Sequence, residues 1–221
     1  MAHILNLDPA RVRIDFAGLN HLVYGFNIYV DYIDKTEEMF NKFLASRQDI
    51  SMKNIGLQDW DRNFLKALNL LPCPYHKYYY KKEDMLKEQL EEFNKGKTRA
   101  LEVMETEKEL FSIYQNPKLA EKPKELELRG GAYYSDVACN LILSIYNDKG
   151  DIQVVNTINK GTIKDFPDHY ALEISSYISR QGPVPCQFID EFPLKIKNLI
   201  HQIKAWEILA AEAAVEGDYN K

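Results

Sequence analysis

The chain has 221 residues, enough for one large domain or two small ones, and can bury a core without a metal or disulfide staple. Its 28 Lys and Arg residues against 33 Asp and Glu residues give a net charge of −5. This charge argues against general nucleic-acid binding, because affinity for phosphates depends on a positive field. The apolar share of 45% and charged share of 28% exclude collagen-like, coiled-coil-only and wholly disordered chains.

Cysteine usage and the chain's apolar segments indicate the compartment. The three cysteines, Cys73, Cys139 and Cys186, include no C-x-x-C pair, so we expect reduced thiols in a cytoplasmic protein. The N-terminus has no signal-peptide pattern. The apolar segment AWEILAAEAAV is interrupted by Glu207 and Glu212, so we expect no membrane span.

The first half of the chain begins with β-rich segments and continues with helices. Alternating residues predict a strand over 11–16, and aromatic and branched residues predict a strand or hairpin over 22–33. Apolar residues at helical spacing predict short helices over 36–46 and 59–71. They also predict one long helical pattern over about 81–115 with a solvated Glu and Lys face.

The second half returns to mixed elements. The patterns predict a helix over 133–146, strands over 151–157 and 170–179, a third strand in PVPCQFI, and a final helix over 193–216. In the first of these helices Val137 and Ile142 are expected to belong to a buried stripe, and in the last Leu209 is expected to face inward. This order of elements predicts an α+β domain.

The segment AGLNHLVYG carries the first candidate site. Asn20 and His21 follow a predicted strand, where a scaffold can direct side chains into a cleft. The imidazole of His21 suits a metal ligand, and the amide of Asn20 suits a hydrogen bond to a sugar hydroxyl. A partly buried structural histidine at the end of a strand is the alternative.

The segment RGGAYYSD carries the second candidate. A Gly-Gly turn after Arg129 delivers Tyr134 to the start of a helix, where negative charge is favoured. A tyrosine near such a helix start, an arginine or a metal has its phenolate favoured and can serve as a base. The alternative is a helix cap made by Ser135 or Asp136.

Two further segments contain polar residues of interest. In VVNTINKG, Asn156 and Asn159 lie where a strand gives way to a loop, so they suit either a hydroxylated or phosphorylated ligand or an ordinary turn. The segment PYHKYYYKK interleaves basic and aromatic residues, but it is short and the chain is acidic. A loop that packs its tyrosines is therefore favoured over a nucleic-acid site.

Taken in this order, the segments resemble a known family. RVRIDFAGLNHLVYG, RGGAYYSDVACNLI, IYNDKGDIQVVNTINKG and IKAWEILAAEAAVEGDYN are similar to the second half of glycoside hydrolase family 4. GLNH and RGG-x-x-YS are the most specific motifs, and LVYG after GLNH favours the 6-phospho-β-glucosidase subgroup. The resemblance covers most of the chain and is thinnest over 36–124.

The resemblance implies a mechanism that avoids the usual pair of carboxylates. In this family bound NAD oxidises C3 of a 6-phospho-sugar, which acidifies the proton on C2. A divalent metal, typically manganese, stabilises the resulting charge, and a tyrosine removes the C2 proton. The aglycone then leaves C1, water adds, and NADH reduces C3 again. The expected substrate is a phosphorylated disaccharide or another 6-phospho-β-glucoside.

Residue roles follow from the matching motifs. The resemblance implies that His21 is a metal ligand and that Tyr134, rather than Tyr133, is the base. It implies substrate contacts for Asn20, Arg129, Asn156 and Asn159. Relatives usually write NTRN where this chain has NTIN, so Ile158 replaces an arginine that would suit a phosphate or partner contact.

Compared with the family pattern, the chain lacks an N-terminal Rossmann domain of the kind that binds NAD, and a metal-binding cysteine in a G-L-C-N-type motif. We therefore expect residues 1–221 to form a substrate- and metal-binding C-terminal domain, truncated at both ends. Its fold should resemble the C-terminal domain of lactate and malate dehydrogenases. Alone it should be inactive, bind NAD and Mn²⁺ poorly and form a homo-oligomer. The alternative is a non-catalytic module for oligomerisation or interaction.

Overall fold

The computed structural model describes residues 7–45, 60–129 and 134–218. The chain forms two compact units. The first contains residues 1–48, 61–73 and 144–221, and the second contains residues 49–60 and 74–143.

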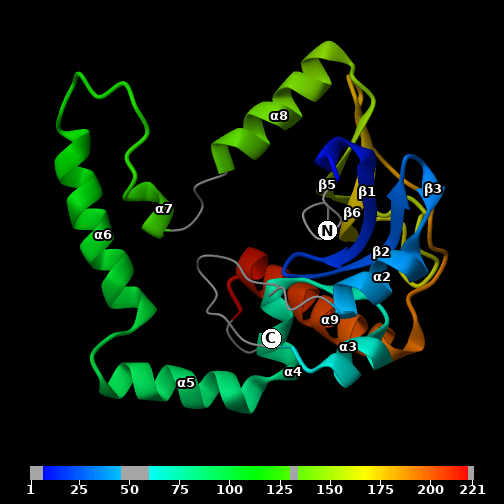
Figure 1. Ribbon diagram of the computed structural model, residues 1–221, viewed down its shortest axis with the longest axis horizontal. Coiled ribbons are helices and arrows are strands. Elements are labelled where there is room, and N and C mark those ends of the chain that lie inside the picture. The colour runs from blue at the N-terminus through cyan, green and yellow to red at the C-terminus, as the bar shows by residue number, and fades with distance from the viewer. Residues whose placement is uncertain (1–6, 46–59, 130–133, 219–221) are drawn as a thin grey trace. The chain divides into compact units, whose positions relative to one another are not determined.

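A seven-stranded antiparallel sheet is the framework of the first unit (Figure 1). Along the main path the strand order is β3-β2-β1-β6-β5, with β4 paired to β2 and β7 paired to β6. The strands, which confirm the expected α+β class, are β1 (Val12–Leu19), β2 (Leu22–Val30), β3 (Ile33–Asp34), β4 (Leu71–Pro72), β5 (Asp151–Ile158), β6 (Ala171–Ser179) and β7 (Gly182–Pro185).

The described part of the first unit also contains helical elements. They are the 3₁₀ turn η1 (Pro9–Arg11), α2 (Thr36–Ala45), α3 (Arg62–Leu68) and α9 (Leu194–Glu216). The last helix contacts β1 and buries Ile196 and Ile200 completely, alongside Ala17 and Ile174 of the sheet. The buried residues explain why the predicted final helix forms, because its first turns place their apolar side chains against the sheet.

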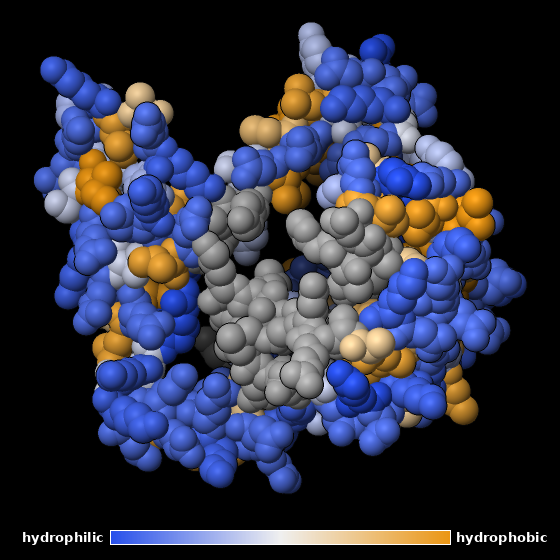
Figure 2. Space-filling model, in the orientation of Figure 1, coloured by the Kyte–Doolittle hydropathy of each residue, from blue (hydrophilic) through white to orange (hydrophobic). Residues whose placement is uncertain are grey.

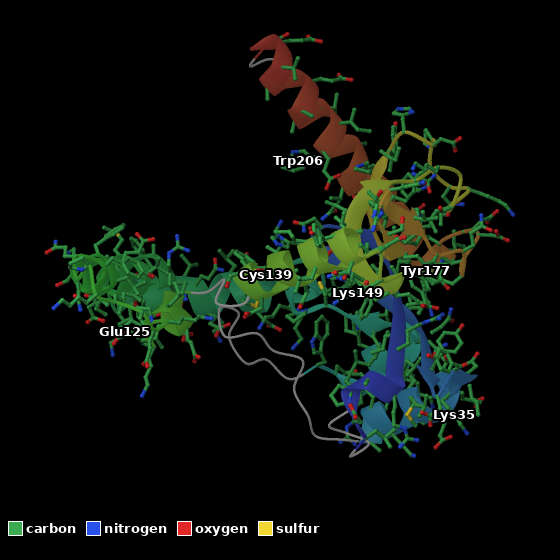
Figure 3. The ribbon with its side chains drawn as sticks, turned by 90° about the horizontal axis from the view of Figure 1, so that it is seen from above. Lys35, Glu125, Cys139, Lys149, Tyr177 and Trp206 are labelled. Atoms are coloured by element: carbon green, nitrogen blue, oxygen red, sulfur yellow. The ribbon has the colours of Figure 1, made fainter. Side chains whose placement is uncertain are left out.

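The C-terminal half of α9 differs from the expectation. Leu209 is exposed instead of facing inward, and Trp206 is 66% exposed. Figure 3 shows Trp206 on the part of α9 that runs on past the strands. The helical pattern therefore extends further along the chain than the sheet that its first turns cover.

The second unit is helical. Its elements are the 3₁₀ turn η2 (Pro74–His76), α4 (Lys77–Tyr80), α5 (Lys82–Asn94), α6 (Arg99–Tyr114) and α7 (Leu126–Arg129). The long predicted helical pattern is thus two helices. The chain turns at Gly96, whose φ is +66°, and the side chain of Thr98 then caps α6 by accepting a hydrogen bond from the backbone N–H of Leu101.

Most apolar residues of α5 and α6 are exposed. Figure 2 shows apolar side chains among charged ones along α6. Among the described residues, α5 buries only Met85, and α6 only Thr106 and Leu110. The exposed apolar residues of the two helices are Leu86, Leu90, Phe93, Leu101, Met104, Phe111 and Tyr114.

Helix α8 (Tyr134–Asn147) corrects a prediction. Its apolar stripe is not buried, because Val137 is 59% and Ile142 63% exposed. The helix begins in the second unit and ends in the first, with the boundary between Leu143 and Ser144. Its stripe is therefore part of neither core. None of the described helices has the length and hydropathy that a bilayer crossing requires.

A side chain organises the loop that follows β5. Asn159 is 1% exposed, and its Nδ2 donates to the carbonyl oxygens of Ile163 at 2.9 Å and Phe166 at 2.8 Å. Its Oδ1 accepts a hydrogen bond from the backbone N–H of Ile163 at 2.8 Å. The Asn159 amide therefore replaces the ladder bonds that this stretch of backbone lacks.

The β1–β2 hairpin requires a glycine near its turn. Gly18 has a φ of +154°, and a Cβ on it would lie 2.2 Å from the carbonyl oxygen of Leu22. No side chain fits at this distance, because the neighbouring atom belongs to the backbone. Gly18 therefore permits the close crossing of β1 and β2 just before their turn.

Replacing Gly18→Ala should lower the free energy of unfolding by about 1–3 kcal/mol, because the methyl group forces the two strands apart. Urea unfolding of the purified chain measures this loss. Gly150→Ala is the matched control, since Gly150 also has a positive φ but nothing lies within 4 Å of its added Cβ. Equal losses in the two variants would show that the close crossing is unimportant.

Replacing Asn159→Asp should lower the free energy of unfolding by about 2 kcal/mol or more at pH 7. The new carboxylate can still accept from Ile163 but faces two carbonyl oxygens without a donor. Burial should raise its pKa above that in the unfolded chain, so the loss should shrink as the pH falls and the acid can donate again. Urea unfolding between pH 4 and pH 7 tests this, with the exposed Asn156→Asp as control. A loss independent of pH would contradict the assigned bonds.

Candidate functional site

The hairpin turn presents Asn20 and His21. Leu19 pairs with Leu22, so these two residues alone connect β1 to β2, and both are exposed. His21 has a φ of +63°, in the left-handed region that side-chain-bearing residues seldom adopt. The Sγ of Cys73 lies 3.5 Å from the backbone oxygen of His21 and donates a hydrogen bond to it. The turn that carries the imidazole is thus held by β4's end as well as by β1 and β2.

The sheet places Asn156 in a row with residues of two other strands. Asn156 of β5 lies directly opposite Glu173 of β6, which in turn lies opposite Gly18 of β1. Residues that are directly opposite in a sheet point to the same face. Asn156 is exposed there, and the Asn20–His21 turn begins two residues beyond Gly18. The first unit therefore places Asn20 and His21 at the end of β1 and Asn156 on β5, with β6 between these two strands.

Glu173 is a residue of this region that the sequence reasoning missed. Burial raises the pKa of its carboxyl group, and its Oε2 is buried without a hydrogen-bond partner among the described residues. The signal in the sequence is a single charge within ALEISSYIS, a strand whose alternate residues are fully buried. A charge at such a position is unusual unless something pairs with it.

Asn159 is placed differently from the other predicted contacts. Both polar atoms of its side chain bond within its own loop, and the residue is buried. In this structure the side chain of Asn159 is therefore engaged by its own loop.

Arg129 and Tyr134 belong to the second unit. Arg129 ends α7, and its Nε donates to Glu107 Oε1 at 2.9 Å. Tyr134 is the first residue of α8 and is 78% exposed. The segment between them, 130–133, lies outside the described residues. That Tyr134 and His21 line one site stays a prediction.

The start of α8 suits a phenolate chemically. The first turn of a helix carries partial positive charge, so a negative oxygen near it is stabilised. Tyr134 occupies that turn.

The residues present fit one part of a metal site. Within the described ranges, no group of three or more His, Cys, Asp or Glu side chains is gathered as a metal centre. An exposed imidazole on a fixed turn nevertheless suits one ligand of a shared site. The sequence contains no G-x-G-x-x-G turn of the kind that binds NAD.

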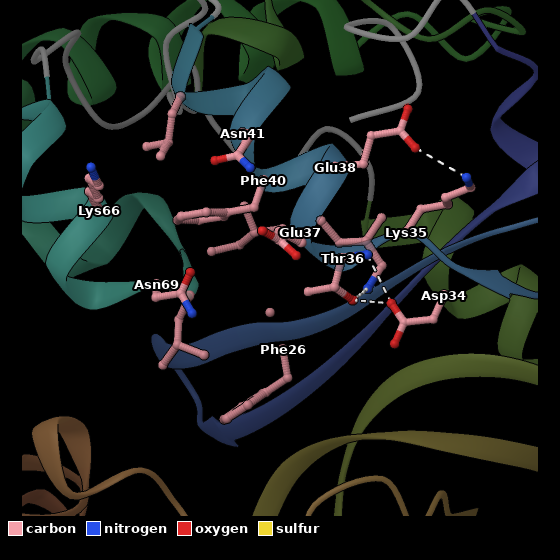
Figure 4. A pocket seen from close by; sticks show the side chains of 15 residues that line it. Phe26, Asp34, Lys35, Thr36, Glu37, Glu38, Phe40, Asn41, Lys66 and Asn69 are labelled. Atoms are coloured by element: carbon pink, nitrogen blue, oxygen red, sulfur yellow. Dashed lines mark hydrogen bonds and ion pairs between the residues drawn. The ribbon is translucent and has the colours of Figure 1, made fainter.

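A cavity of about 890 Å³ lies elsewhere in the first unit, between β2, α2 and α3. Figure 4 shows Phe26 and Phe40 in its lining together with Asn41, Lys66 and Asn69. None of the six residues predicted for the site from the sequence lines this cavity. It is therefore separate from the row at Asn156 and Glu173.

Comparisons with known proteins agree on one family. The model of the family 4 glycosyl hydrolase C-terminal domain matches residues 16–221. A probable 6-phospho-beta-glucosidase of Bacillus subtilis (strain 168) is 48% identical over 99% of this chain and 49% of its own length. A 6-phospho-beta-glucosidase of Escherichia coli (strain K12) is 40% identical over 96% of this chain and 48% of its own length.

A solved structure has the same fold. The 6-phospho-beta glucosidase of Thermotoga maritima, determined with manganese, NAD+ and glucose-6-phosphate, superposes with a TM-score of 0.81 at 31% identity. The match covers 99% of this chain and 49% of the other. This chain thus spans about half the length of the relatives it matches. The matched residues include Asn20, His21, Tyr134 and Asn156, and the chain belongs to glycoside hydrolase family 4, whose C-terminal domain it contains.

Proposed function

We propose that this chain is the substrate- and metal-binding half of a cytoplasmic 6-phospho-β-glucosidase. The observation that carries the proposal is the 48% identity over nearly the whole chain to the Bacillus subtilis relative of that name. The fold shared with the Thermotoga maritima enzyme, solved with manganese, NAD+ and glucose-6-phosphate, supports the substrate class. The substrate is a β-glucoside phosphorylated at C6.

In the first unit, His21 is the residue that would hold a divalent metal, with manganese the expected ion. When bound, such an ion polarises substrate oxygens and stabilises negative charge that develops on them. The Cys73 hydrogen bond and the pairing of Leu19 with Leu22 hold the backbone of the turn that carries this imidazole. Asn20 and Asn156 offer amide donors and acceptors that suit sugar hydroxyls.

In the second unit, Tyr134 is the proposed base. Its Oη accepts the proton that leaves C2 of the sugar. Arg129 contributes positive charge that suits the substrate phosphate, although it is paired with Glu107 here. Binding of the phosphate would have to compete with that exposed ion pair, which is a weak interaction.

A second candidate function is assembly without catalysis. The observation that favours it is the exposed apolar side chains of α5, α6 and the end of α9, among them Phe93, Phe111 and Trp206. Large exposed apolar groups often mark interaction surfaces. Self-association would fit both candidates, since a homo-oligomer is also expected for the enzyme, so activity rather than assembly separates them.

The isolated chain should not hydrolyse a chromogenic 6-phospho-β-glucoside when supplied with NAD and Mn²⁺, because it has no Gly-rich turn for the hydride carrier. Placing it after the half of the Bacillus subtilis relative that it does not match should restore turnover. Release of the chromophore measures both. Turnover by the isolated chain would contradict the proposal that the other half of the enzyme binds NAD. An inactive fusion that folds would favour the assembly function.

In that fusion, Tyr134→Phe should lower kcat about 100-fold or more while KM changes little, because the phenol acts on the proton and not in binding. Steady-state kinetics with the chromogenic substrate give both constants. Tyr133→Phe removes the neighbouring hydroxyl and is the matched control, expected to keep most of the activity. A Tyr134→Phe variant with unchanged kcat would remove Tyr134 from the role of base.

A further inference from the structure

Glu173 carries a carboxylate oxygen that the first unit leaves without a donor. Its Oε2 is buried and accepts no hydrogen bond from any described residue. Burial of this group raises its pKa, which shows that the surroundings disfavour the charged form. A buried acceptor without a donor costs free energy, so its presence calls for a physical reason.

The sheet register determines which residues lie directly opposite Glu173. On one side the directly opposite residue is Gly18, which has no side chain to cover Glu173. On the other side it is Asn156, whose side chain is exposed. The three positions form one row on one face of the sheet. A ligand on this row would meet an amide and a carboxylate side by side.

We propose that Glu173 is a further substrate-contacting residue, whose Oε2 accepts a hydrogen bond from a hydroxyl group of the bound sugar beside Asn156. The inference rests on the proposed function, because it takes its ligand from there. Gly18, the member of this row on β1, lies two residues before Asn20. The row is therefore close to the turn that carries His21, the proposed metal ligand.

A sugar hydroxyl fits this position chemically. Within the described residues, Glu173 belongs to no group of three or more His, Cys, Asp or Glu side chains. A hydroxyl needs only one acceptor and can donate to it while accepting from the neighbouring amide. A site with a dedicated acceptor also discriminates strongly against sugars that lack the hydroxyl.

The test compares Glu173→Gln with wild type in the 221-residue chain, titrated with glucose-6-phosphate and followed by NMR. Glutamine keeps the shape but removes the charged acceptor, so we expect binding to weaken about 10- to 100-fold. Glu191→Gln is the matched control, because it removes the same charge from an exposed position of the first unit. Its affinity should stay within about twofold of wild type.

Two further measurements separate a contact from a structural role. The carboxyl carbon of Glu173 should titrate at lower pH once glucose-6-phosphate is bound, because a donor favours the charged form. The urea midpoint of Glu173→Gln should not fall, since Glu173 Oε2 accepts no hydrogen bond from the described residues. A lower urea midpoint with unchanged affinity would overturn the inference and show that Glu173 has a structural role. Unchanged affinity with an unchanged midpoint would also overturn it and would show that the carboxylate binds water and not the sugar.

The outcomes distinguish the inference from the function on which it rests. If wild type binds glucose-6-phosphate and Glu173→Gln binds it equally well, the function stands and the contact is refuted. If wild type does not bind glucose-6-phosphate, the proposed substrate half fails, and the assignment of Glu173 fails with it.

Discussion

The pairing of β1 with β6 is the interaction on which the first unit depends. It joins the first hairpin of the chain to strands from its last third, and the backbone N–H of Phe16 donates to Ser175 Oγ across a separation of 159 residues. Ala17 and Ile174 are buried at this contact. Because loop closure over such a distance is costly in entropy, the contact must be rewarded by a large buried core. The helix α9 completes that core by covering β1.

The same pairing sets the position of the candidate site residues. It fixes which residue of β6 faces Gly18, and the register of β5 then places Asn156 beside Glu173. A shift by one residue would turn Glu173 into the core and Ile174 out of it. The burial of Ile174 and Leu172 therefore fixes the outward direction of the charged and amide side chains as firmly as direct bonds would.

Sequence reasoning predicted elements whose pattern is local. Alternating residues predicted β1, β5 and β6, aromatic and branched residues predicted β2, and helical spacing predicted α9. It was wrong on burial where a pattern needs a distant partner. The stripe of α8 is apolar and yet exposed, because spacing identifies a face without identifying what covers it. The sequence alone could not separate Asn159 from the ligand contacts, because its hydrogen bonds lie within a loop whose conformation no spacing predicts. It could not identify Glu173 either, because the position of Glu173 beside Asn156 depends on the register between strands.

The requirement for glycine at position 18 bears on how this fold can diversify. A backbone oxygen occupies the space of any side chain there, so a substitution of Gly18 would disturb the fold next to the Asn20–His21 turn. The exposed side chains of β5 are under no such steric limit, as the isoleucine at position 158 illustrates. Changes of side chain along β5 are therefore sterically easier than a change at position 18.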